Sequence, residues 1–279
     1  MRPTHFISIA LITLLALITL LAWPAPPAWA GPDEDPAPAD SSLPDAEDVA
    51  DVKALDLTAA GEERQRFALI GLDEQKSAPR GGYGLVLILP GGDGSVDFHP
   101  FIKRIHKHAV PEGYLTAQLV APVWSEEQAK NLVWPIEKSK VREAAFTTEQ
   151  FVENVVKEVA GKVDLDRKRV FTLTWSSSGP AGYAVSLEKQ TPVTGTFVAM
   201  SVFKPEQLPS LKAAKGHPYF ILHSPDDFIP IRFAEEARDQ LEKKKAKVRL
   251  KTYPGGHGWK GNVYGNIREG LEFLADHAK

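Results

Sequence analysis

Hydrophobic positions in residues 52–279 fall into short continuous runs that alternate with segments of helical spacing. A continuous apolar run is typical of a strand buried on both faces, and a three-to-four spacing is typical of a helix. This pattern predicts strands at 83–92, 114–122, 169–174, 194–200, 218–223 and 247–253, and helices at 97–109, 146–163, 179–188, 232–245 and 263–277. The alternating order predicts an α/β fold with a mostly parallel central sheet and helices on both faces.

Two further features complete the expected domain. The helix at 146–163 has the clearest signature, because Thr147 and Gln150 form a capping box ahead of an apolar stripe. Segments 52–57 and 66–71 flank a short turn and predict an N-terminal antiparallel hairpin. About 230 residues rich in branched apolar side chains are expected to form one domain, 52–279, around one core.

The first thirty residues follow a different pattern. Arg2 and His5 precede an apolar run, prolines follow it, and the segment ends in Ala28-Trp29-Ala30. These features are typical of a secretory signal peptide cleaved after Ala30. The alternative is an uncleaved anchor, because a run of about 18 apolar residues is near the lower limit for spanning. We expect an exported protein, periplasmic or secreted, without stable membrane insertion after cleavage.

Composition separates a linker from the domain and excludes several function classes. Residues 31–51 hold eight acids, four prolines and no Lys or Arg, which predicts a flexible acidic linker. The remaining 228 residues carry 32 basic and 28 acidic side chains, a balance of +4 that is too weak for nucleic-acid binding. The absence of cysteine excludes disulfides, thiolate nucleophiles and cysteine-ligated metals.

Chemically versatile residues gather where four predicted strands end. The stretches are PGGDGS (90–95), WSSSG (175–179), HSPDDF (223–228) and PGGHGW (254–259). Ligands and catalytic groups of open α/β sheets collect at the carboxyl ends of the strands. Serine, aspartate, histidine and exposed backbone amides are therefore expected together, a set that suits nucleophilic acyl transfer.

The three consecutive serines can be distinguished by their register on a strand-to-helix turn. Positions two before and two after the nucleophile must be small, because strand and helix approach closely there. Ser176 meets this condition, with Thr174 and Ser178 at these positions, whereas Ser177 would place Trp175 in the crowded register. We expect Ser176 to be the nucleophile, with Ser177 as the alternative. A serine-rich helix cap without chemistry is the competing interpretation.

A base and an acid must accompany the serine. His257 lies on a glycine-rich loop after the last predicted strand and is the expected base. Asp227 is the expected acid, and Asp226 remains the alternative because either carboxyl group follows the strand at 218–223. A surface-loop histidine and a turn-capping aspartate are the structural alternatives. We expect His223 to have a structural role.

Backbone amides of Gly92 and Ser177 are the expected oxyanion hole. The glycine-rich stretch lacks the Gly-Lys-Ser/Thr of a phosphate loop and the GxGxxG spacing, so a nucleotide is not expected. His99, His106 and His108 lie near one predicted helix, but 106 and 108 point to different faces. We expect no metal and no cofactor.

Four stretches of the chain resemble the α/β-hydrolase superfamily over about residues 50–279: LVLILPGGDGS, VFTLTWSSSGPAGYA, ILHSPDDFIPIRFAEEA and YPGGHGW. The similarity is greatest to exported members of the dienelactone-hydrolase and phospholipase/carboxylesterase-like group. It implies an α/β-hydrolase fold and a Ser176–His257–Asp227 triad. Two departures are visible: the usual Gly-x-Ser-x-Gly reads Thr-x-Ser-x-Ser, and the acid loop is one residue shorter before Pro230.

The resulting hypothesis is an exported serine hydrolase that cleaves small carboxylic esters through an acyl-enzyme. One alternative is a serine peptidase of the prolyl-oligopeptidase-like type, and another is a degenerate hydrolase used only for binding. The stretch APVWSEEQAKNLVWP (121–135) is expected either to roof an apolar pocket or to pack as a surface excursion.

Overall fold

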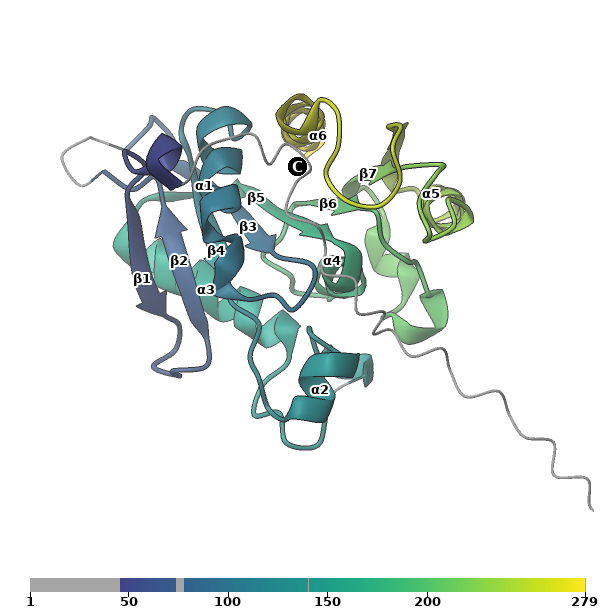
Figure 1. Ribbon diagram of the computed structural model, residues 1–279, viewed down its shortest axis with the longest axis horizontal. Helices are drawn as coiled ribbons and strands as arrows, with labels where there is room; N and C mark the ends of the chain where they lie inside the picture. Colours follow the sequence, from purple (N-terminus) through teal and green to yellow (C-terminus); the bar gives the residue numbers. More distant parts are fainter. Residues whose placement is uncertain (1–45, 74–77, 140, 279) are drawn as a thin grey trace, which may run out of the picture.

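The structure, a computed structural model, describes residues 46–73, 78–139 and 141–278. The expected signal peptide and residues 31–45 of the expected linker lie outside the described residues. Eight strands form one sheet in the order β1-β2-β4-β3-β5-β6-β7-β8 (Figure 1). They are β1 (Ala54–Thr58), β2 (Arg66–Ile70), β3 (Tyr83–Leu89), β4 (Tyr114–Leu119), β5 (Leu165–Trp175), β6 (Gly195–Ala199), β7 (Pro218–His223) and β8 (Lys247–Thr252).

Strands β3 to β8 are parallel to one another, whereas β2 is antiparallel to both β1 and β4. The expected N-terminal hairpin is therefore present as the pair β1–β2. The expected parallel sheet is also present, and its carboxyl edge collects the loops that follow β3, β5, β7 and β8. Strand β5 begins at Leu165 rather than at 169, because Leu165 already pairs with Tyr83 ahead of a register shift.

Helices cover the sheet on both faces. They are α1 (His99–His108), α2 (Glu126–Asn131), α3 (Thr148–Lys162), α4 (Gly179–Ser186), α5 (Arg232–Lys243) and α6 (Val263–His277). Short 3₁₀ turns occupy Ala46–Val49, Val96–Phe98, Glu137–Ser139, Ser176–Ser178, Pro205–Gln207 and Leu211–Ala214. One buried cluster joins the sheet to α3, α4 and α5, and a second joins it to α1 and α6. Thr147 and Gln150 form the expected capping box of α3.

The end of the expected linker is folded rather than flexible. Val49 is buried, the guanidinium of Arg104 forms two hydrogen bonds to the carboxylate of Asp48, and Lys107 pairs with Asp51. The structure therefore places residues 46–51 with the folded domain, against α1. Acidic composition suggested solvation, but these acids find cationic partners on the helix. None of the described helices is both long and apolar enough to cross a membrane.

Candidate active site

The turn between β5 and α4 carries Ser176 in a conformation that side chains seldom adopt. Its φ is +52°, in the left-handed region, directly after the extended residue Trp175. Such backbone strain persists only where the surrounding structure enforces it, and it is common at active sites. Here the hydroxyl of Ser201, which follows β6, donates to the carbonyl of Ser176 at 2.6 Å. The strained turn thus holds the partly exposed Ser176 side chain at the carboxyl edge.

Both departures from the usual small residues around the nucleophile are accommodated. Thr174 is fully buried, and a Cβ at Gly182 on α4 would lie 2.5 Å from its Oγ1, so the missing side chain at 182 makes room for it. Ser178 is also fully buried. Its Oγ accepts from the Trp175 N–H at 2.9 Å and lies 2.6 Å from the carbonyl oxygen of Leu89, to which it donates. Ser178 therefore ties the turn to β3 as well as being small.

Trp175, the last residue of β5, is buried in the core directly before the nucleophile. Its indole makes edge contacts with the rings of Phe98, Phe101 and Trp259. A Cβ at Gly91 would lie 2.5 Å from the same indole, so the loop after β3 can approach only because position 91 is glycine. This packing fixes Trp175 at the position before the exposed serine.

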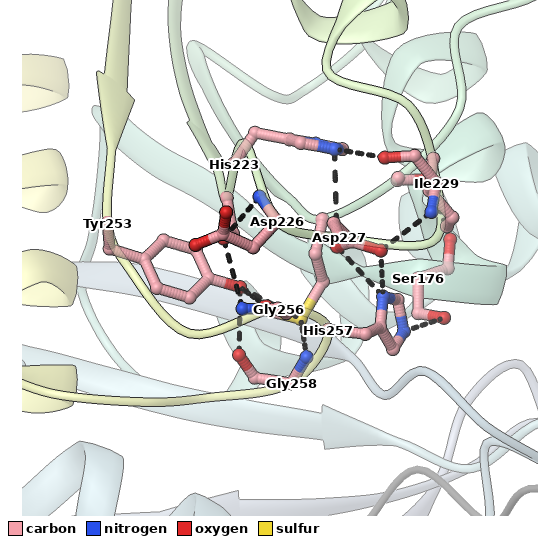
Figure 2. Close-up of polar contacts among 12 residues, drawn as sticks. Ser176, His223, Asp226, Asp227, Ile229, Tyr253, Gly256, His257 and Gly258 are labelled. Atoms are coloured by element: carbon pink, nitrogen blue, oxygen red, sulfur yellow. Dashed lines mark hydrogen bonds and ion pairs between the residues drawn. The ribbon is translucent and has the colours of Figure 1, made fainter.

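His257 lies between Ser176 and Asp227, as Figure 2 shows. Its Nε2 is 3.0 Å from Ser176 Oγ, and its Nδ1 is 2.9 Å from each carboxylate oxygen of Asp227. A carboxylate only accepts hydrogen bonds, so Nδ1 carries the proton and Nε2 is left to accept from the serine hydroxyl. The structure thus joins the three expected triad residues in one hydrogen-bonded chain.

The side chain of Asp227 is completely removed from solvent. Its Oδ1 accepts from the backbone N–H of Ile229 at 2.7 Å, and the Ile229 carbonyl lies 2.8 Å from Nε2 of His223, which donates to it. His223 therefore has the expected structural role, because it closes the loop that aims the carboxylate (Figure 2). A buried carboxylate depends on such partners to offset its lost hydration.

Neither alternative residue takes the position of its neighbour. Ser177 Oγ donates to the carbonyl of Gly92 at 2.8 Å, whereas Ser176 Oγ faces the imidazole. Asp226 is exposed and its Oδ2 accepts from the N–H of Gly255 at 3.4 Å, whereas Asp227 faces Nδ1. The geometry favours Ser176 over Ser177 and Asp227 over Asp226, because only Ser176 and Asp227 contact the imidazole of His257.

The two expected oxyanion residues are held next to each other. The bond from Ser177 Oγ to the Gly92 carbonyl links the loop after β3 to the first turn beyond the nucleophile. The amide of Ser177 belongs to a first helical turn, where N–H groups have no intrahelical acceptor. The loop is further fixed by Trp134, whose Nε1 donates to the Pro90 carbonyl at 2.9 Å. Trp134 is buried, so this tryptophan supports the loop instead of roofing an opening.

Several supporting side chains were not recognised in the sequence. Ser224 Oγ accepts from the N–H groups of Asp226 and Gly256 and so joins the acid loop to the histidine loop. The phenol of Tyr253 donates to the carbonyl of Gly258 at 2.8 Å. Burial, and then the nearby Asp227 charge, raise the pKa of Tyr253, so the phenol keeps its proton. The sequence signal was only the position of these hydroxyl groups at the ends of predicted strands, Ser224 directly after 218–223 and Tyr253 as the last residue of 247–253.

The histidines near α1 have other partners. His99 Nδ1 lies 2.6 Å from Gln118 Oε1, His106 Nδ1 lies 2.9 Å from Thr116 Oγ1, and the ring of His108 packs on Tyr264. Across the described ranges, no three His, Asp or Glu side chains are grouped as a metal site would require.

Solved structures similar to this chain include several esterases. A thermostable esterase shares 18% identity, with 83% of this chain and 64% of that protein covered and a TM-score of 0.58. The Bacillus cereus carboxylesterase shares 15%, with 82% and 95% covered and a TM-score of 0.54, and a Pseudomonas putida esterase shares 14%, with 82% and 83% covered and a TM-score of 0.58. The fold is that of the α/β-hydrolases.

The strand order and the loops of the carboxyl edge agree with this α/β-hydrolase fold. This chain spans only 64% of the length of the thermostable esterase. No protein-family profile matches the sequence, and no curated protein matches it. At these identities the structural similarity establishes the fold alone.

Proposed function

We propose that the protein is a carboxylesterase-type serine hydrolase, with Ser176 as nucleophile, His257 as base and Asp227 as the acid that orients it. The observation that carries this proposal is the continuous contact from Ser176 Oγ through the imidazole to the buried Asp227 carboxylate, at distances of 3.0 and 2.9 Å. This geometry supports acyl transfer because a serine hydroxyl becomes a nucleophile only when a base accepts its proton.

The reaction proceeds in two displacements. Ser176 Oγ bonds to the ester carbonyl carbon while its proton passes to Nε2 of His257, and the carbonyl oxygen becomes an oxyanion against the amides of Gly92 and Ser177. The bond to the alkoxy oxygen then breaks, and the proton on Nε2 passes to that oxygen to release the alcohol. A water oxygen then bonds to the acyl carbon while a water proton passes to Nε2 of His257. The bond to Ser176 Oγ breaks, this oxygen takes the proton back from Nε2, and the carboxylic acid is released.

The contacts at the turn favour an active enzyme over a degenerate hydrolase used for binding. Thr174 and Ser178 replace the usual glycines, yet Gly182 makes room for the first and the second donates to the Leu89 carbonyl. The left-handed φ of Ser176 is also retained, a strained conformation that is common at active sites. The substitutions therefore leave the nucleophile in place.

A fluorophosphonate probe tests the proposal directly. The mature protein is expected to be labelled at Ser176, and Ser176→Ala to remove the label while the far-UV circular dichroism stays unchanged. Absence of labelling in the wild type, or labelling at another residue, would contradict the assignment. A panel of small esters and short peptides then separates the esterase from the prolyl-oligopeptidase-like alternative, with ester cleavage as the expected outcome.

Within the α/β-hydrolases we assign the chain to the exported dienelactone-hydrolase and phospholipase/carboxylesterase-like group, on the motifs of its four strand-end loops. Export rests on residues 1–30, which have the composition of a signal peptide. Amino-terminal sequencing of the protein recovered from the exported fraction is expected to begin at Gly31. A product that retains Met1 in the membrane fraction would contradict export by cleavage.

A further inference from the structure

Large exposed apolar side chains are unevenly distributed over the described residues. Val96, Val123 and Phe228 lie in the connections that follow β3, β4 and β7 at the carboxyl edge of the sheet, Val96 in a 3₁₀ turn, and Leu55 lies on the outer strand β1. Single exposed apolar side chains are ordinary on a protein surface, whereas a group around one site indicates an interaction with an apolar ligand. The exposure of Val96, Val123 and Phe228 therefore requires an explanation, whereas that of Leu55 does not.

Phe228 is the most exposed of these side chains, at 75%. It directly follows the acid Asp227, and its ring centroid lies 4.4 Å from that of His257, with the two planes inclined by 43°. The imidazole thus covers only a small part of the phenyl ring. Any group that binds on the exposed part of Phe228 lies beside the imidazole that exchanges protons with Ser176.

The valines lie on the other side of the nucleophile. Val96 directly follows the oxyanion loop, and Val123 is two residues beyond Ala121, whose N–H donates to the Gly94 carbonyl at 2.9 Å. In the sheet, β7, which precedes Phe228, lies on one side of β5, whereas β3 and β4, which precede Val96 and Val123, lie on the other side. These two sides correspond to different parts of an ester.

The chemistry of the reaction identifies the part that meets Phe228. Nε2 of His257 must deliver its proton to the alkoxy oxygen as the carbon–oxygen bond breaks, so that oxygen lies within hydrogen-bond reach of the imidazole. The carbonyl oxygen lies instead against the amides of Gly92 and Ser177. The alcohol half of the ester is therefore on the histidine side, where Phe228 is exposed.

We propose that Phe228 is a specificity residue that binds the apolar alcohol group of the ester, so that aryl and arylalkyl esters are preferred over methyl esters of the same acid. This inference rests on the proposed esterase function and adds the identity of the ester half that is recognised. An aromatic ring offers a large apolar surface and favours stacking with a second ring. Contact removes from water both the phenyl ring of Phe228 and the apolar alcohol group while that group leaves.

The test compares benzyl and methyl butanoate, which share an acid and differ only in the alcohol. In Phe228→Ala the ratio of kcat/KM for benzyl butanoate to that for methyl butanoate is expected to fall about tenfold from its wild-type value. Phe228→Leu, which keeps an apolar surface, is expected to retain most of the ratio. Leu55→Ala, an exposed apolar change on β1, is the matched control and should leave the ratio unchanged.

Labelling by a fluorophosphonate separates recognition from positioning, because its fluoride leaving group has no apolar surface. Phe228→Ala is expected to be labelled at the wild-type rate. An unchanged benzyl-to-methyl ratio would overturn the proposal while leaving the esterase function intact. Equal losses for both esters and for labelling would also overturn it, since Phe228 would then only hold His257. A wild type that is neither labelled nor active would overturn both proposals.

Discussion

Among the described residues, a serine, a histidine and an acid gather both at the carboxyl edge of the sheet and at its amino edge, where the parallel strands begin. At the carboxyl edge they are Ser176, His257 and Asp227. At the amino edge, a groove of about 410 Å³ is lined by ten residues that include Ser186, Glu188 and His217. The residue types are nearly the same, but the contacts are not.

At the amino edge Ser186 and His217 form hydrogen bonds that hold the fold. Ser186 Oγ donates to the Tyr183 carbonyl at 2.7 Å and lies 2.9 Å from the phenol of Tyr219. His217 Nε2 lies 2.9 Å from Thr196 Oγ1, and burial lowers the pKa of His217 to about 4. At the carboxyl edge, by contrast, the imidazole connects a strained serine to a buried carboxylate. The comparison teaches that connection between the groups, rather than their presence, distinguishes a candidate catalytic site.

The sharpest way to break this comparison is to remove each serine hydroxyl. Ser176→Ala is expected to lower kcat for ester hydrolysis by on the order of 10⁴-fold or more, because the covalent step has no nucleophile. Ser186→Ala is expected to leave kcat per folded molecule near the wild-type value, with only a modest loss of stability. Initial rates normalised by circular dichroism give the measurement. Comparable losses in the two variants would refute the distinction between the edges.

Adjacent carboxyl groups provide the next comparison. Asp227→Asn is expected to lower kcat by on the order of 10⁴-fold, since an amide can hold the imidazole in the wrong tautomer and cannot stabilise imidazolium. Asp226→Asn, at an exposed carboxyl group whose Oδ2 accepts from the Gly255 N–H, should leave kcat nearly unchanged. Steady-state kinetics on one ester decide between them. A larger loss for Asp226→Asn would reverse the assignment of the acid.

The amino edge is expected to affect stability toward acid rather than catalysis. Burial lowers the pKa of His217 to about 4, below the ordinary value of 6.5, so the unfolded chain binds the proton first. Neutral His217 therefore contributes fully to the free energy of unfolding above about pH 6.5. This contribution is lost as the pH falls toward 4, a change on the order of 3 kcal/mol. Burial lowers the pKa of His106 to about 4 in the same way.

Denaturant unfolding at pH 7 and at pH 4.5 measures this loss. His217→Gln keeps a group that can hydrogen-bond to Thr196 but does not titrate in this range. We expect the variant to lose less of its free energy of unfolding between the two pH values than the wild type does. The remaining loss reflects His106 and other groups. An identical pH dependence in the two proteins would show that His217 has no part in it.

The smallest expected effect sharpens the roles of the consecutive serines. Ser177→Ala removes the hydrogen bond that ties the Gly92 carbonyl to the turn, while it keeps the Ser177 amide. We expect kcat to fall by on the order of tenfold with little change in KM, because a displaced donor weakens the transition state more than the bound substrate. Ser177→Thr, which retains a hydroxyl, should restore part of kcat. A loss confined to KM would point to substrate binding instead.

Local patterns predicted most of the fold, and the exceptions have clear causes. Continuous apolar runs identified the parallel strands, because strands buried on both faces must be apolar along their length. The start of β5 at Leu165 was missed, since residues 166–169 are polar and at least partly exposed, and the pairing of Leu165 with Tyr83 precedes a register shift. Residues 46–51 were expected to be linker, because their acidic composition does not reveal the cationic residues of α1 that they meet.

The sequence by itself determined the α/β order, the exclusion of thiol chemistry and, through the size of Trp175, the register that favours Ser176 over Ser177. These depend on spacing and volume, which are local properties of the chain. Only the tertiary structure placed Asp227 rather than Asp226 against His257, bonded the Ser177 hydroxyl to the Gly92 carbonyl, and placed the exposed ring of Phe228 beside His257. Those outcomes depend on side-chain directions from loops far apart in sequence, and such directions are set only when the strands assemble into one sheet.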